Sequence, residues 1–132
     1  MRNYSALRDN ADIHENISIS VDCECGNDIT VTVQVIQTGG QQFVDGFPPM
    51  VAYLATLTGG LALEASSGGV AAGTRGTVGT LLTDDSVFTI TPDANGFVDV
   101  VVTQTGCDSI FMIVIDPQDG SKISSDELVF TT

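Results

Sequence analysis

The sequence has few basic residues and a single histidine. Four lysine and arginine residues stand against 17 aspartate and glutamate residues, so the 132-residue chain carries a formal net charge of −13. Such a negative field repels the phosphates of nucleic acids and of anionic lipids, which argues against partners of either kind. His14 is the only histidine and lies near the N-terminus, so a serine or cysteine nucleophile would lack the histidine base that usually lies beside it inside a fold. We therefore expect a protein that is not an enzyme and binds neither nucleic acid nor membrane.

Cysteine is also scarce, with only Cys23, Cys25 and Cys107 present. The first two are too close along an extended strand to pair easily, and the odd count leaves one thiol over. We interpret all three as free thiols of a protein made in a reducing cytosol, packed as small apolar side chains. The alternative is a zinc site that also uses His14, although no C-x2-C pair accompanies it.

Long apolar runs are missing as well. No run reaches the roughly 18 residues of a membrane-spanning helix, and the polar N-terminus lacks the apolar stretch of a secretion signal. Apolar residues do not recur at helical spacing, apart from a short turn expected at residues 61–65. Yet 42% of the residues are hydrophobic, which is enough to form a core without disulfides or metals.

What the sequence does contain is apolar and polar residues in alternation. This period of two predicts a strand with one solvated face over residues 17–25, a turn at 26–28 and a second strand over 29–35, which together form a hairpin. Further strands are expected at residues 50–56, 77–83, 87–91, 97–104, 109–116 and 127–131. Those at 97–104 and 109–116 are apolar on both faces and should lie centrally in a sheet, whereas the last strand can lie at an edge.

Seven or eight short strands separated by turns indicate an all-β fold, an immunoglobulin-like antiparallel β-sandwich. We assign the sandwich to residues 17–132 and an extended N-terminal arm to residues 1–16. The chain has no tryptophan, and its cysteines do not fit the disulfide pattern of antibody domains, so this likeness is one of architecture.

The arm is polar, with a few widely spaced residues suited to contact a partner. We expect it to order on a binding surface with Arg2, Tyr4, Leu7, Arg8 and Ile13 as the partner-binding residues. A frayed terminus is the alternative. A second segment is the stretch of small residues 66–76. It is either a flexible loop that only connects two strands or a contact surface that another segment or molecule approaches closely.

Acidic residues dominate the second half of the chain. Between Arg75 and Lys122 there is no basic residue, and seven aspartates there should face solvent or a basic partner: Asp84, Asp85, Asp93, Asp99, Asp108, Asp116 and Asp119. Most fall at strand ends or turns, where aspartate usually bonds turn amides. A structural calcium ion at the turns 93–96 and 116–120 is the alternative, although neither fits the EF-hand pattern.

Several segments between Ile29 and Phe130 follow one another in a distinctive order. They are residues 29–35, 50–54, 67–74, the turn 93–96 before 98–100, and 111–115 closed by 117–120. In this order they resemble a family of small virion proteins of tailed bacteriophages, often encoded near the major capsid protein. The arm and the hairpin Cys23-Glu24-Cys25 depart from it.

This resemblance implies a structural protein of the capsid surface, without cofactors, that decorates and stabilises the shell. Its partners would be the major capsid protein and neighbouring copies of itself, and it would be made in the cytoplasm of the host bacterium. The alternative is an immunoglobulin-like binding module on a fibre or tail, which recognises carbohydrate or a host surface with or without calcium.

Overall fold

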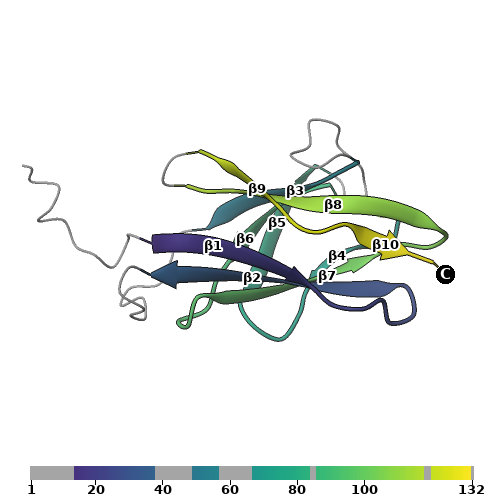
Figure 1. Ribbon diagram of the computed structural model, residues 1–132, viewed down its shortest axis with the longest axis horizontal. Helices are drawn as coiled ribbons and strands as arrows, with labels where there is room; N and C mark the ends of the chain where they lie inside the picture. The colour runs from purple at the N-terminus through teal and green to yellow at the C-terminus, as the bar shows by residue number, and fades with distance from the viewer. Residues whose placement is uncertain (1–13, 38–48, 57–66, 84–85, 118–119, 132) are drawn as a thin grey trace, which may run out of the picture.

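The protein folds from β-strands alone in the part of the chain that the structure describes. The computed structural model describes residues 14–37, 49–56, 67–83, 86–117 and 120–131 (Figure 1). Its strands are β1 (His14–Val21), β2 (Asp28–Gln37), β3 (Met50–Ala55), β4 (Gly69–Ala72), β5 (Thr77–Thr83), β6 (Val87–Thr91), β7 (Phe97–Thr103), β8 (Asp108–Ile115), β9 (Lys122–Ser124) and β10 (Leu128–Phe130). Within these ranges there is no helix of the length and apolarity needed to cross a membrane.

The strands form two antiparallel sheets. The first sheet has the order β1-β2-β7-β4, and the second has the order β10-β8-β3-β6-β5, with β9 also paired to β8. Every pairing in both sheets is antiparallel. The all-β prediction with antiparallel sheets is therefore confirmed.

One hydrophobic core joins the two sheets, which lie as two layers in Figure 1. Because side chains alternate along a strand, β2 and β7 each send every second residue inward. Buried members from the first sheet are Ile17, Ile29, Val31, Val33, Val35, Val98, Val100 and Val102, and those from the second include Ala52, Leu54, Phe88, Ile90, Met112 and Val114. Burial of these side chains stabilises the fold at roughly 25 cal/mol per Å² of apolar surface.

The two strands predicted to be central are indeed interior. β7 lies between β2 and β4, and β8 lies between β10 and β3, while β10 ends its sheet as expected. Tyr53, Ala55 and Ile113 form a second buried cluster, so β3 and β8 are buried on both faces. The expected hairpin is present too, with Val21 opposite Val31 in the register of β1 and β2.

The first strand differs from its prediction at both ends. β1 begins at His14, inside the stretch assigned to the arm, because its polar residues still pair with β2 as far as Gln37. It ends at Val21, and a tight turn closed by hydrogen bonds between Cys25 and Asp28 follows. Backbone pairing sets the ends of a strand, and the alternating pattern simply continues past the last pair.

Two short strands were not predicted. β4 lies within the small-residue stretch and pairs with β7, and β9 pairs with residues 113–115 of β8. Neither has a clear alternation of apolar and polar residues, because each is only a few residues long. The short turn expected at residues 61–65 lies outside the described residues.

Candidate functional site

The residues predicted to bind a partner lie outside the part of the chain that the structure describes. This holds for all five, namely Arg2, Tyr4, Leu7, Arg8 and Ile13. The aspartates Asp84, Asp85 and Asp119 also lie outside it. The candidate site is therefore built from the two sheets and the turns between them.

The cysteines are free, as expected, but they are not packed in the core, so the expectation that they pack as small apolar side chains was wrong. Cys23, Cys25 and Cys107 are free and exposed. The first two follow the last residue of the β1–β2 ladder and lie at the hairpin turn, where Cys25 still forms a bridge with Asp28. The Cys107 thiol donates to the backbone oxygen of Thr131 at 3.4 Å.

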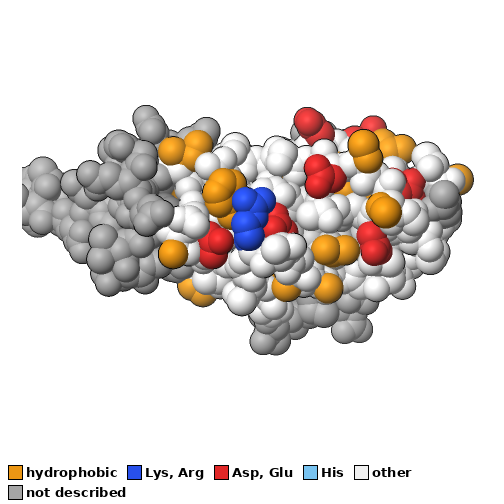
Figure 2. All heavy atoms as spheres, turned by 90° about the horizontal axis from the view of Figure 1, so that it is seen from below, with side chains coloured by type: hydrophobic (Ala, Val, Ile, Leu, Met, Phe, Trp, Pro, Cys, Tyr) orange, Lys and Arg blue, Asp and Glu red, His pale blue; other side chains and the backbone are white. Residues whose placement is uncertain are grey.

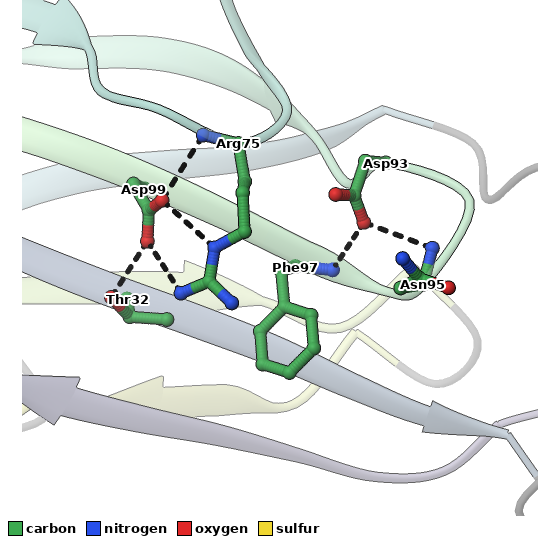
Figure 3. A network of polar contacts seen from close by, with 6 residues as sticks. All are labelled: Thr32, Arg75, Asp93, Asn95, Phe97 and Asp99. Carbon is green, nitrogen blue, oxygen red and sulfur yellow. Dashed lines mark hydrogen bonds and ion pairs between the residues drawn. The ribbon is translucent and has the colours of Figure 1, made fainter.

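The turn Asp93-Ala94-Asn95-Gly96 is held by its own aspartate. The Asp93 Oδ1 atom accepts hydrogen bonds from the backbone N–H of Asn95 at 2.9 Å and of Phe97 at 3.0 Å (Figure 3). This is the turn-amide role that aspartate commonly plays. In the described ranges, no three His, Cys, Asp or Glu side chains are grouped so that they could hold a metal ion.

Asp99 and Arg75 form a salt bridge with two side-chain hydrogen bonds. The Arg75 Nε atom donates to Asp99 Oδ2 at 3.0 Å, and Nη2 donates to Oδ1 at 3.1 Å (Figure 3). Thr32 Oγ1 donates to Oδ1 as well, at 2.7 Å. The guanidinium also lies over the Phe97 ring, with its central carbon 4.1 Å from the ring centroid. These contacts fix the arginine in one orientation.

The pair shifts the protonation equilibria of both side chains. Hydrogen bonds from Arg75, with a smaller one from Thr32, lower the pKa of Asp99 although burial of the carboxyl opposes this shift. The hydrogen bond to Asp99 raises the pKa of Arg75 in turn. Asp99 is only 5% exposed, so of the two expected surroundings, solvent or a basic partner, solvent is wrong for this residue. It does face a basic group, and that group belongs to the same chain.

Close approach of the small-residue stretch to β7 positions Arg75. The N–H of Gly73 donates to the backbone oxygen of Asp99 at 2.8 Å, and the N–H of Asp99 donates to that of Arg75 at 2.8 Å. A Cβ atom on Gly73 would lie 2.8 Å from the Cβ of Asp99, closer than real side chains come. This stretch is therefore a surface of close approach, the second of the two predicted alternatives.

These residues border a pocket of ≈ 400 Å³ on the outer face of the first sheet. Its lining consists of Asp22, Thr30, Thr32, Gly73, Thr74, Arg75, Asp99 and Val101. Figure 2, which views the molecule from below Figure 1, shows a basic group in the middle of a face with acidic side chains around it. β2 and β7 provide the floor, because Thr30, Thr32, Asp99 and Val101 alternate with the inward-facing valines.

Comparison with known proteins gives no relative for this chain. No family model, no curated protein and no solved structure matches it.

The sequence itself contains a signal for this pair. Asp99 is a charged residue within a strand that was predicted to be central, and a buried carboxylate needs a partner. Arg75 is the one basic residue in the stretch 66–76. What the sequence did not contain was the register of β4 against β7, which brings the two together.

Proposed function

We propose that this protein is a non-enzymatic structural component of a tailed-bacteriophage virion, which decorates the capsid and stabilises it by packing on major capsid protein subunits. The proposal rests on the resemblance described above and on two features of the fold. These are the order of the strands and the separation of the two ends of the domain.

The strand order supports an immunoglobulin-like sandwich. Constant-type immunoglobulin domains have the strands A, B, E and D in one sheet and G, F and C in the other. The sheet β1-β2-β7-β4 has the first order, and β10-β8-β3 has the second. β6 and β5 extend the second sheet beyond β3, as the extra strands of variable-type domains do, although here they follow β4 in the sequence.

The observation that carries the proposal is the placement of the two ends. β1 starts at one end of the long axis, and β10 lies toward the other, beside the turn between β1 and β2 (Figure 1). A domain of this shape can attach through the segment that precedes β1 and project its opposite end. β1 is also an edge strand in the described sheet, and edge strands can pair with a strand of a neighbouring subunit.

Binding to capsids tests this proposal. The purified protein is added to DNA-free capsids assembled from the major capsid protein encoded nearby, and bound copies are counted after sedimentation. We expect saturation at a fixed number of copies per shell and a higher melting temperature of the decorated shell. Absence of saturable binding would rule out the capsid as the partner.

Variants within residues 1–13 then test the arm. Removal of these residues leaves β1 intact, whereas the longer arm first assigned would have cut into it. We expect Leu7→Ala and Tyr4→Ala to weaken capsid binding, while Asn10→Ala, the matched polar control, leaves it unchanged. Equal binding by all three variants and by the truncated chain, with unchanged circular dichroism, would refute the arm's role but not the decoration itself.

A further inference from the structure

The pocket on the first sheet presents polar groups that have no hydrogen-bond partner among the described residues. No hydrogen bond joins the hydroxyls of Thr30 and Thr74, or the carboxylate of Asp22, to another of the described residues. The hydroxyl of Thr32 donates its hydrogen bond to Asp99, and its oxygen can still accept hydrogen bonds from a ligand. The walls therefore offer hydroxyls that both donate and accept, next to a carboxylate that only accepts.

Arg75 adds fixed donors to this set. Of its three nitrogens, Nε and Nη2 bond Asp99, and Nη1 donates to none of the residues that the structure describes. The side chain is 42% exposed, yet the bonds to Asp99 and the stacking on Phe97 hold it in place. Binding to a fixed arginine does not require a further loss of side-chain freedom, which favours even a small ligand.

The charges of the lining decide which ligands fit. Two carboxylates, Asp22 and Asp99, outnumber the single guanidinium, and the whole chain is strongly negative, so an anionic ligand is disfavoured. Asp99 is already neutralised by Arg75, so a metal ion would find little free negative charge there. Val101 is the one apolar side chain of the lining, so a hydrophobic ligand would bury little of its surface against apolar groups.

We propose that this pocket binds a neutral saccharide. A sugar ring carries hydroxyls that donate to Asp22 and accept from Arg75, and its apolar C–H face can lie against Val101. The volume of ≈ 400 Å³ falls in the range of small-molecule pockets, about 300–1,000 Å³. The polar lining differs from that of most such pockets and matches a hydroxyl-rich ligand.

Amide chemical shifts of the isolated, isotope-labelled protein test the proposal without any capsid, so its outcome is independent of the proposed decoration. The probes are glucose, galactose, mannose and N-acetylglucosamine at millimolar concentrations, together with galacturonate and trilysine. We expect at least one neutral sugar to shift amides of the pocket lining, residues 73–75 and 99 above all. Galacturonate should bind more weakly than galactose, because the two differ by one carboxylate.

Isosteric variants connect the shifts to the pocket. Thr30→Val and Thr74→Val each remove one hydroxyl and should weaken sugar binding roughly two- to tenfold, the value of one net hydrogen bond. Thr77→Val is the matched control, because Thr77 is exposed and starts β5 in the other sheet. Three results would overturn the proposal: no shift with any of the four neutral sugars, shifts with trilysine alone, or equal weakening by all three valine variants.

Discussion

Arg75 and Asp99 are bonded to each other in both directions. The backbone N–H and the guanidinium of Arg75 donate to the carboxylate of Asp99, and the backbone N–H of Asp99 donates to the backbone oxygen of Arg75. This relationship ties the stretch after β4 to the middle of β7. It also provides one wall of the pocket on the first sheet, so stability and the proposed sugar binding depend on the same two residues.

The pair should make the protein's stability depend on pH. Because the folded-state pKa of Asp99 is lower than its unfolded value, the stabilisation is complete above the unfolded pKa, about 3.9, and is lost as the pH falls through the folded pKa. We expect Asp99→Asn to lower the free energy of unfolding by roughly 1–3 kcal/mol at pH 7. The difference from the parent protein should shrink below about pH 4. Urea denaturation at pH 7 and pH 3 measures both values, and an equal difference at the two pH values would contradict this account.

Gly73 should tolerate no side chain. A Cβ there would lie 2.8 Å from the Cβ of Asp99 and 3.3 Å from its backbone oxygen, so Gly73→Ala must push the stretch away from β7. We expect a loss of about 1–3 kcal/mol in the free energy of unfolding and a weaker Arg75–Asp99 pair. Ala71→Ser, an exposed change in the adjacent strand β4, is the control. If thermal melting shows the same stability for both variants, the close approach is not required.

The shared core predicts a large contrast between two apolar positions. Phe88 in β6 is fully buried, and Phe88→Ala should cost about 3–5 kcal/mol because a cavity remains. Val129 in the edge strand β10 is 48% exposed, so Val129→Ala should change stability by less than about 0.5 kcal/mol. Chemical denaturation of both variants measures the contrast. Similar losses in the two would mean that β10 is covered in solution, for instance by another copy of the chain.

The cysteines should react while the protein is folded. All three thiols are exposed, so a thiol reagent such as dithionitrobenzoate should titrate them without denaturant. Replacement of each by serine should change the free energy of unfolding by less than about 0.5 kcal/mol. Titration of the same sample in denaturant gives the total for comparison. Thiols that react only after denaturation would restore the interpretation of a buried, apolar role.

Much of the fold could be predicted from local pattern. The strands at 77–83 and 87–91 were predicted with the bounds that they have, because a period of two between turn residues is a local property. The central positions of β7 and β8 followed from residues that are apolar on both faces. Cys23 and Cys25 were misplaced because alternation in the sequence continues beyond the last ladder pair of β1.

The candidate site could not be predicted in the same way. Its lining comes from β2, from β7, from Asp22 just after β1 and from the stretch after β4, and no local pattern predicts which segments lie side by side. In the sequence, Asp99 looks like one more residue of an acidic surface. Only the register of β4 on β7 shows that Arg75 lies beside it.

Composition and alternation by themselves determined that this acidic chain forms strands with one polar face and one apolar, valine-rich face. The reason is that the hydrophobicity of a side chain is a property of the residue and does not depend on its neighbours in space. The tertiary structure alone decided the order of the strands, the neutralisation of Asp99 and the pocket beside it. Those features arise from pairings between residues far apart in the chain, whose energies exist only once both partners are in place.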